Sequence, residues 1–127
     1  MSAKILLAED NASNRYLATY LLRNAGFTVL TAHNGHEAIR LALAESPDLV
    51  LMDIQMPEMD GYEAAKRMHS DPLLASIPIV AVTSYAMTSD RTKALEMGFV
   101  GYLEKPIQPL TFVSQISRFL PGKAAHA

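Results

Sequence analysis

Short continuous apolar runs and longer segments with apolar residues at helical spacing follow one another along the chain, and each change of pattern marks a predicted element. Five short apolar runs predict β-strands over residues 4–8, 27–32, 49–53, 77–83 and 99–104. The third run, from Leu49 to Met52, contains no polar position, which is typical of a strand buried on both faces. Pro78 is expected near the start of the fourth strand, because proline cannot donate a hydrogen bond inside a central ladder.

Segments with apolar residues at helical spacing lie between and after these runs. They predict helices over residues 12–25, from 34–35 to before Pro47, over 60–69, over 88–97, and from Pro109 onward. Asn11 or Ser13 can cap the first helix, and Gly26 can end it. The helix over 88–97 has a thin apolar stripe, so we expect it to be loosely held.

Two predictions concern side-chain packing on these helices. On the last helix, the residues predicted to face the core are Leu110, Val113, Ile116 and Leu120. Phe112 and Phe119 are predicted at the edge of that face, where an aromatic ring can either pack or contact a partner. Tyr16 and Tyr20 are predicted to pack beside the core face of the first helix.

The alternation of strands and helices through short connections predicts one α/β domain. We expect a doubly wound, five-stranded parallel sheet with right-handed crossovers and with helices on both faces. The domain is expected to cover residues 1–120, followed by a short C-terminal tail over residues 121–127 and by no output domain.

Composition narrows the classes of function. The chain of 127 residues carries 11 basic and 13 acidic residues, a net charge of −2, and no cysteine. Disulfides, thiolate catalysis and zinc–thiolate sites are therefore excluded, and the nearly balanced charge gives no indication of nucleic-acid binding. The first apolar run is too short for a signal peptide or a membrane span, so we expect a cytoplasmic protein with no membrane partner.

Polar side chains follow four of the five predicted strands. The residues are Glu9 and Asp10 after the first strand, Asp53 at the end of the third, Thr83 at the end of the fourth, and Lys105 after the fifth. Because the carboxyl ends of parallel strands share one edge of the sheet, we expect these side chains to meet in one pocket. The simpler alternative for Asp53 is that it caps the turn that follows it.

The chemistry of this set indicates phosphoryl transfer. Three carboxylates in one pocket repel one another unless a cation neutralises them, and carboxylate oxygens suit Mg²⁺. Lys105 supplies a flexible positive charge for an anion such as phosphate, and Thr83 supplies a hydroxyl group. Phosphoryl transfer depends mainly on positioning and electrostatic stabilisation, which such a set provides.

Other catalytic classes find little support. The chain has no G-x-x-x-x-G-K-[ST] loop, no G-x-G-x-x-G turn and no serine in a nucleophile elbow. Its four histidines, at positions 33, 36, 69 and 126, lack the i, i+4 pairing of zinc sites and are predicted on the surface.

Four sequence blocks stand at the ends of predicted strands. They are Glu9-Asp10-Asn11, Met52-Asp53-Ile54-Gln55-Met56-Pro57 with Asp60-Gly61, Thr83-Ser84, and Gly101-Tyr102-Leu103-Glu104-Lys105-Pro106. With these blocks in this order, residues 3–120 resemble the receiver domain of bacterial two-component response regulators. The resemblance implies a flavodoxin-like fold with strand order 2-1-3-4-5. The chain departs from the family pattern at Phe99-Val100, where many relatives carry a small or acidic residue.

The resemblance implies chemical roles for the polar side chains. Asp53 resembles the phosphoacceptor, which takes a phosphoryl group from a histidine kinase or a histidine phosphotransfer protein. Mg²⁺ is implied as the cofactor, bound by Asp10 with the help of Glu9, and by Asp53 and the backbone carbonyl of Gln55. Lys105 is expected to pair with the phosphoryl oxygens.

Further positions resemble a switch and a partner surface. Thr83 is expected to move toward the phosphoryl group while the ring of Tyr102 turns inward. Ser84 leaves room for that group, Tyr85 is expected to shield it from water, and the Lys105–Pro106 bond is expected to be cis. The predicted partner surface consists of Asn11, Asn14, Pro106, Phe112 and Phe119.

The implied function is that of a stand-alone, phosphorylation-switched signalling protein. It would dock on a downstream protein, which the sequence does not identify, or pass the phosphoryl group onward. It would catalyse only its own phosphorylation and dephosphorylation. The alternatives are a receiver domain from a hybrid histidine kinase and an Mg²⁺-dependent aspartyl-phosphate phosphatase. Gln55 argues against the phosphatase, because such enzymes usually carry a second acid two residues after the nucleophile.

Overall fold

The computed structural model describes residues 3–56, 58–84, 92 and 95–120. The strands are β1 (Lys4–Ala8), β2 (Thr28–Ala32), β3 (Leu49–Asp53), β4 (Ile79–Thr83) and β5 (Gly101–Glu104). The helices are α1 (Ala12–Asn24), α2 (Gly35–Glu45), α3 (Gly61–Ser70) and α5 (Phe112–Ser117). The helix predicted over 88–97 lies mostly outside the described residues, although Leu95 and Glu96 within it are helical.

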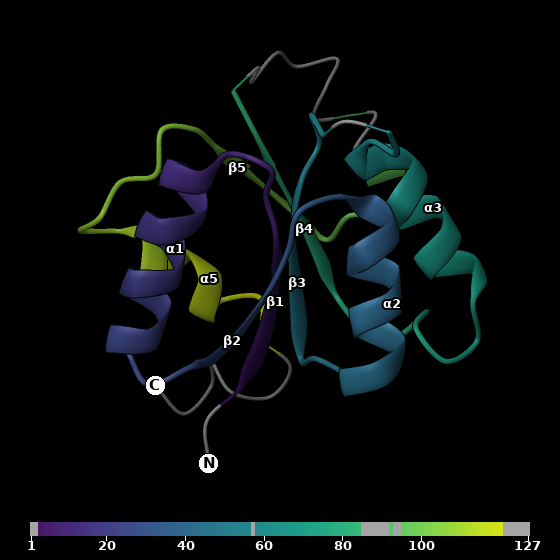
Figure 1. The fold of residues 1–127 in the computed structure, drawn as a ribbon, viewed down its shortest axis with the longest axis horizontal. Helices are drawn as coiled ribbons and strands as arrows, with labels where there is room; N and C mark the ends of the chain where they lie inside the picture. Colours follow the sequence, from purple (N-terminus) through teal and green to yellow (C-terminus); the bar gives the residue numbers. More distant parts are fainter. Residues whose placement is uncertain (1–2, 57, 85–91, 93–94, 121–127) are drawn as a thin grey trace.

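The strands form one parallel sheet in the order β2-β1-β3-β4-β5. Helices α1 and α5 cover one face of this sheet, and α2 and α3 cover the other (Figure 1). The predicted doubly wound fold and its flavodoxin-like strand order are therefore confirmed. No helix within the described ranges is long and apolar enough to cross a membrane.

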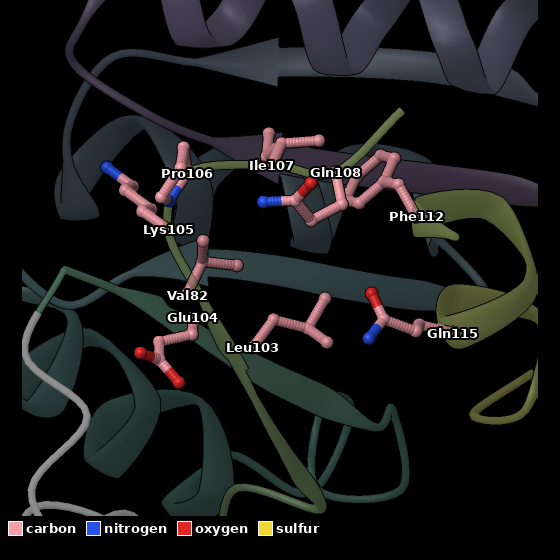
Figure 2. Close-up of a pocket in the computed structure, with 9 residues that line it drawn as sticks. All are labelled: Val82, Leu103, Glu104, Lys105, Pro106, Ile107, Gln108, Phe112 and Gln115. Atoms are coloured by element: carbon pink, nitrogen blue, oxygen red, sulfur yellow. The ribbon is translucent and has the colours of Figure 1, made fainter. Parts of the chain in front are cut away.

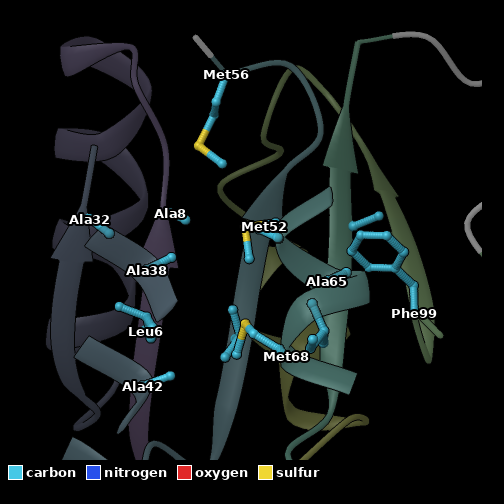
Figure 3. Packing of buried hydrophobic residues seen from close by; sticks show 14 of the residues in the cluster. Leu6, Ala8, Ala32, Ala38, Ala42, Met52, Met56, Ala65, Met68 and Phe99 are labelled. Carbon is cyan, nitrogen blue, oxygen red and sulfur yellow. The ribbon is translucent and has the colours of Figure 1, made fainter. Parts of the chain in front are cut away.

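Successive side chains along each strand point to opposite faces of the sheet and pack in two separate cores. On β3, Val50 and Met52 belong to the core under α2 and α3, whereas Leu49 and Leu51 belong to the core under α1 and α5. This arrangement explains why the third apolar run has no polar position, since each of its two faces is covered by helices. Figure 3 shows the core under α2 and α3, where Met68 of α3 faces the sheet.

Asparagine and aspartate side chains define the starts of the first three helices. Asn11, Asn34 and Asp60 each accept a hydrogen bond, 2.9 Å long, from the backbone N–H three residues later. Caps of this kind contribute about 1 kcal/mol each. Asn11, rather than Ser13, is thus the cap of α1. Gly26, with a φ angle of 98°, follows the end of this helix, as predicted.

The packing predicted for the last helix is confirmed for Ile116 and Leu120, which are buried in the core under α1 and α5, but it was wrong at the start of the helix. Helix α5 begins at Phe112 rather than at Pro109, because the N–H groups of Thr111 and Phe112 both donate to the carbonyl of Gln108 in a preceding turn. Leu110 lies in that turn and is 98% exposed, whereas Phe112 is 2% exposed and belongs to the core under α1 and α5. Phe112 therefore cannot offer its ring to a partner, and its place in the predicted partner surface is corrected.

The edge strand β5 carries an aromatic contact at its first residue. A Cβ atom placed on Gly101 would lie 2.3 Å from the ring of Phe119, so only glycine leaves room for this ring against the strand. Phe119 is half-buried and packs at the edge of the core under α1 and α5. Its predicted position at the edge of that core is confirmed.

Tyr16 and Tyr20 are exposed, contrary to the prediction that they pack beside the core. Their exposed fractions are 76% and 58%. The buried positions of α1 are Ala18 and Leu22. Ala18 follows Tyr16 by two residues, and Leu22 follows Tyr20 by two residues. Two residues correspond to a rotation of about 200° around the helix axis, so each tyrosine points away from the buried side. The two tyrosines therefore lie on the solvent face of α1.

Candidate functional site

The carboxyl edge of the sheet gathers three carboxylates, named here the acidic cluster: Glu9, Asp10 and Asp53. One carboxylate oxygen from each lies within 4.8 Å of the others. Ala8 of β1 pairs with Met52 of β3, so the residue after β1 reaches the level of the last residue of β3. Glu9 and Asp53 are each 2% exposed, whereas Asp10 is exposed to solvent.

Lys105 joins this cluster from the end of the edge strand. Its Nζ atom lies 3.0 Å from Glu9 Oε1 and 3.0 Å from Asp53 Oδ2, and its side chain is 12% exposed. Its backbone N–H donates to the Thr83 carbonyl at 2.7 Å, which continues the pairing of β5 with β4 by one residue. The Lys105–Pro106 bond is cis, as the resemblance implied. One ammonium group thus bridges two buried carboxylates from different strands.

Ionisation of Asp53 is costly in this environment. Burial and the neighbouring Glu9 carboxyl group raise the pKa of Asp53 from 3.8 to about 6, although the Gln55 N–H and the Lys105 ammonium favour the charged form. Burial lowers the pKa of Lys105, but hydrogen bonds to Glu9 and Asp53 outweigh it, and the pKa of this lysine is raised. The cluster therefore holds more negative charge than Lys105 neutralises, and a further cation would stabilise it.

The loop after β3 holds the Asp53 carboxylate in place. The Gln55 N–H donates to Asp53 Oδ1 at 2.9 Å, and the Gly61 N–H donates to the Ile54 carbonyl at 2.9 Å, which closes the loop. A Cβ atom on Gly61 would lie 2.5 Å from the Asp53 carbonyl oxygen, so this position requires glycine. The backbone of Glu58 has a φ angle of 67°, in the left-handed region that residues other than glycine seldom adopt.

Arg15 is a contact of the site that the sequence analysis missed. Its Nη1 atom donates to the Glu9 carbonyl at 2.8 Å and lies 3.4 Å from the Asp10 carbonyl. Sequence patterns place Arg15 on the polar face of α1, where a solvent-exposed side chain is the ordinary expectation. The sequence feature that could have indicated this contact is the position of Arg15 in the first turns of α1, the helix that follows Glu9 and Asp10.

Two further predicted site residues, Thr83 and Ser84, lie at the same edge. Thr83 is buried at the end of β4, and Ser84 beside it is exposed. Tyr102 is half-buried and packs against the core under α2 and α3. Tyr85 lies outside the described residues.

The segment after β5 covers a neighbouring pocket of about 290 Å³. The lining residues that Figure 2 labels are Val82, Leu103, Glu104, Lys105, Pro106, Ile107, Gln108, Phe112 and Gln115. Of the predicted partner residues, Phe112 and Pro106 line this pocket. Pro106 and Asn11 are exposed, and Asn14 is half-buried.

The donor set of the acidic cluster suits Mg²⁺. This ion prefers oxygen ligands, takes one or two carboxylates and keeps several waters. The cluster offers an exposed carboxylate, Asp10, beside two buried ones, so a bound ion would remain accessible to water. The backbone carbonyl of Gln55, two residues after Asp53, stays the further oxygen donor that the resemblance implies.

Comparisons with known proteins agree with this geometry. A family model described as the response regulator receiver domain matches residues 5–117. The chain belongs to this family. It is 38% identical over 120 residues to the polar-differentiation response regulator DivK of Brucella anthropi, covering 94% of this chain and 98% of that protein.

Solved structures of receiver domains show the same fold. The chemotaxis protein CheY4 of Vibrio cholerae superimposes with a TM-score of 0.90 at 30% identity, covering 94% of this chain and all of CheY4. The receiver domain of sensor histidine kinase PA1611 from Pseudomonas aeruginosa, with a magnesium ion coordinated in its active site cleft, gives a TM-score of 0.85 at 32% identity, covering 94% of this chain and 98% of that one.

Membership of the family places the protein in two-component signalling. Receiver domains are signalling proteins that interact with histidine kinases or phosphotransfer proteins. The protein is accordingly a phosphorylation-dependent signalling domain of the type represented by DivK and CheY. The acidic cluster of this chain is consistent with the Mg²⁺ site of receiver domains.

Proposed function

We propose that this receiver accepts a phosphoryl group on Asp53 from a histidine kinase or a histidine phosphotransfer protein. The observation that carries this proposal is the position of Asp53, a buried carboxylate that belongs to the acidic cluster and shares the Lys105 ammonium with Glu9. A capping role for Asp53 alone would not require a half-buried lysine ammonium 3.0 Å from its carboxylate.

The proposed reaction is a phosphoryl exchange between nitrogen and oxygen. A carboxylate oxygen of Asp53 forms a bond to phosphorus while the bond from phosphorus to the donor imidazole breaks, and the imidazole keeps that electron pair. Mg²⁺ held by Glu9, Asp10, Asp53 and the Gln55 carbonyl would offset the charge of the carboxylates and of the phosphoryl oxygens. The Gln55 N–H holds Asp53 Oδ1 and so orients the attacking group.

Lys105 and Thr83 have proposed roles after transfer. The Lys105 ammonium, which bridges Glu9 and Asp53, would form a new ion pair with a phosphoryl oxygen. The Thr83 hydroxyl would hydrogen-bond the same group, and Ser84 would leave room for it. Tyr102 would then turn inward and carry the change to the surface of β5. Shielding of the phosphoryl group by Tyr85 stays a prediction.

The test of the phosphoacceptor uses acetyl phosphate and Mg²⁺ with intact-mass measurement. We expect the parent to gain one phosphoryl group and Asp53→Asn to gain none. Asp60→Asn is the matched control, because asparagine caps a helix as well as aspartate does and Asp60 is the cap of α3. This control should label like the parent. Undiminished labelling of Asp53→Asn would reject the assignment.

A docking surface for the phosphodonor is proposed at the start of α1 and the turn after β5. Asn11, Asn14 and Pro106 lie there, at the same edge of the sheet as Asp53. Residues 11–36 and 105–120 contain no aspartate or glutamate, so α1 and α5 carry no negatively charged side chain. Phe119 lies at the opposite end of β5, so we propose it as a contact for the unidentified downstream protein.

Two phosphoryl donors separate docking from chemistry. Asn14→Ala should slow transfer from any purified histidine phosphotransfer protein that phosphorylates the parent, because docking loses a contact. The same variant should react with acetyl phosphate at the parent's rate, since that donor needs no docking surface. Equal slowing with both donors would place Asn14 in the chemistry instead of the interface.

We further propose that the chain catalyses only its own phosphorylation and dephosphorylation. We also propose that it acts in the cytoplasm and does not bind nucleic acid. Gln55 supports this over a phosphatase, because it leaves no second acid two residues after Asp53. A generic phosphate ester such as p-nitrophenyl phosphate should give no sustained turnover. Continuous product release would favour the phosphatase.

A further inference from the structure

One arginine of α1 ties together the backbone that carries two members of the acidic cluster. Arg15 Nη1 lies 2.8 Å from the Glu9 carbonyl and 3.4 Å from the Asp10 carbonyl. Both carbonyls follow Ala8, the last residue of β1, so they lie beyond the regular ladder of the sheet. The Arg15 side chain is partly buried, which limits the competition of water for these bonds.

The remaining contacts of this loop hold Glu9 more directly than Asp10. The Glu9 N–H donates to the Ala32 carbonyl at 3.0 Å, and the Glu9 carboxylate accepts from the Asn11 N–H and from Lys105. The Asp10 side chain is exposed at the start of the loop. The direction of its carboxylate therefore depends on the backbone that Arg15 holds.

We propose that Arg15 is a positioning residue for Mg²⁺ binding: it fixes the backbone of Glu9 and Asp10 so that the Asp10 carboxylate points to the ion. This inference rests on the proposed function, in which the acidic cluster binds Mg²⁺. Residues that orient metal ligands without touching the metal change metal affinity by about 10–100-fold when they are removed.

A second effect of Arg15 opposes the first. Its positive charge repels a nearby cation, so removal of the guanidinium would strengthen Mg²⁺ binding if charge alone mattered. The guanidinium faces two carbonyls rather than the carboxylates, and solvent and salt screen the repulsion of a partly exposed group. We therefore expect loss of orientation to outweigh relief of repulsion.

Three substitutions of Arg15 and one matched control distinguish these effects. Arg15→Ala removes the charge and both contacts, Arg15→Gln removes the charge but keeps a polar side chain, and Arg15→Lys keeps the charge and one donor group. Arg23→Ala is the control. Arg23 lies on the same helix, carries the same charge and also donates to a backbone carbonyl, that of Val29, away from the cluster.

The measurement is the Mg²⁺ dissociation constant from amide chemical shifts of residues 9–11 and 53–55, with folding verified in the same spectra. Arg15→Ala should weaken Mg²⁺ binding about tenfold. Arg15→Lys should recover part of this loss, and Arg23→Ala should match the parent. At saturating Mg²⁺, Arg15→Ala should accept the phosphoryl group from acetyl phosphate at the parent's rate.

Each other outcome overturns the proposal. Parent-like or tighter Mg²⁺ binding in Arg15→Ala would show that repulsion dominates. Equal weakening in Arg15→Ala and Arg23→Ala would show a long-range charge effect, and a slow rate at saturating Mg²⁺ would place Arg15 in the transfer step. If Arg15→Ala does not fold, Arg15→Gln and Arg15→Lys carry the same comparison. Failure of the parent to label at any Mg²⁺ concentration would reject the proposed function instead.

Discussion

At the scale of single residues, the reactivity of Asp53 depends on two opposing neighbours. Lys105 stabilises its charged form from 3.0 Å, while burial and the Glu9 carboxyl group favour the neutral form. Burial and Glu9 together have the larger effect, so the pKa of Asp53 is raised to about 6. A nucleophile that is costly to ionise gains most from a bound cation, so the proposed Mg²⁺ site and the phosphoacceptor depend on one another.

The first prediction at this scale concerns stability and pH without metal. Between pH 3.8 and about 6 the folded protein binds more protons at Asp53 than the unfolded chain, so its stability falls as the pH rises through this range. Asparagine resembles the neutral carboxyl group and does not titrate. In EDTA, Asp53→Asn should therefore gain stability over the parent as the pH rises, by about 1–3 kcal/mol near neutral pH.

Urea unfolding at about pH 4.5 and about pH 7.5 measures this difference. Saturating Mg²⁺ provides the control, because it binds the folded parent and should reduce or reverse the advantage of Asp53→Asn. A stability difference that is the same at both pH values would show that Asp53 titrates normally.

The second prediction concerns the exposed member of the acidic cluster. Asp10→Ala should weaken Mg²⁺ affinity by at least about tenfold, because it removes a proposed ligand oxygen, and should block phosphorylation at moderate Mg²⁺. The same change should make the metal-free protein slightly more stable, since it relieves repulsion within the cluster. Mg²⁺ titration and urea unfolding test the two parts separately. Parent-like Mg²⁺ affinity would remove Asp10 from the site.

At the scale of elements, α5 shows how the start of a helix decides which side chains are buried. The turn that precedes it, closed on the Gln108 carbonyl, places Phe112 inside and Leu110 outside. The side chain of Phe112 belongs to the core under α1 and α5 and lines the pocket beneath the segment after Lys105. Helix α5 and Lys105 thus line the same pocket.

This arrangement predicts opposite outcomes for two neighbouring alanine substitutions. Phe112→Ala should lower the free energy of unfolding by about 3–5 kcal/mol, because it removes a buried ring from the core. Leu110→Ala should change it by less than about 0.5 kcal/mol, because that side chain is in solvent. Urea unfolding of both variants measures the contrast. Similar decreases in the free energy of unfolding for the two variants would show that Leu110 packs in the core, as periodicity predicted.

At the scale of the whole molecule, the site connects the ends of β4 and β5. Thr83 ends β4, and Lys105 follows β5 and donates its N–H to the Thr83 carbonyl. Both side chains are proposed to contact the phosphoryl group. Tyr102, which pairs with Ala81 across these strands, packs against the core under α2 and α3. A new bond at the site would therefore act on the segment between residues 83 and 106.

We predict that phosphorylation changes backbone amide chemical shifts mainly over residues 83–106, beyond the direct neighbours of Asp53. Spectra recorded with acetyl phosphate and Mg²⁺ test this expectation, and Asp53→Asn under the same conditions removes the effect of the reagents. Changes limited to residues adjacent to Asp53 would show that the phosphoryl group does not switch this surface.

The amino-acid sequence by itself determined the approximate positions of the five strands and the first three helices, and the polar residues that follow the strands. The unbroken run from Leu49 to Met52 requires a strand covered on both faces, and polar residues after parallel strands must share one edge of the sheet. Glu9, Asp10, Asp53, Thr83 and Lys105 could therefore be placed together from their positions alone. The cap of α1 was narrowed to Asn11 or Ser13, because a cap acts within one helical turn, and the structure selects Asn11.

Only the tertiary structure decided the properties that depend on residues far apart in the chain. Periodicity could not show that a turn on Gln108 delays α5, nor that Tyr16 and Tyr20 face solvent. The raised pKa of Asp53 comes from burial and from Glu9, which is distant in sequence. Arg15 bonds to the backbone that precedes its own helix. Local patterns record which side chains are apolar, whereas burial, charge contacts and helix register follow from how the elements meet in space.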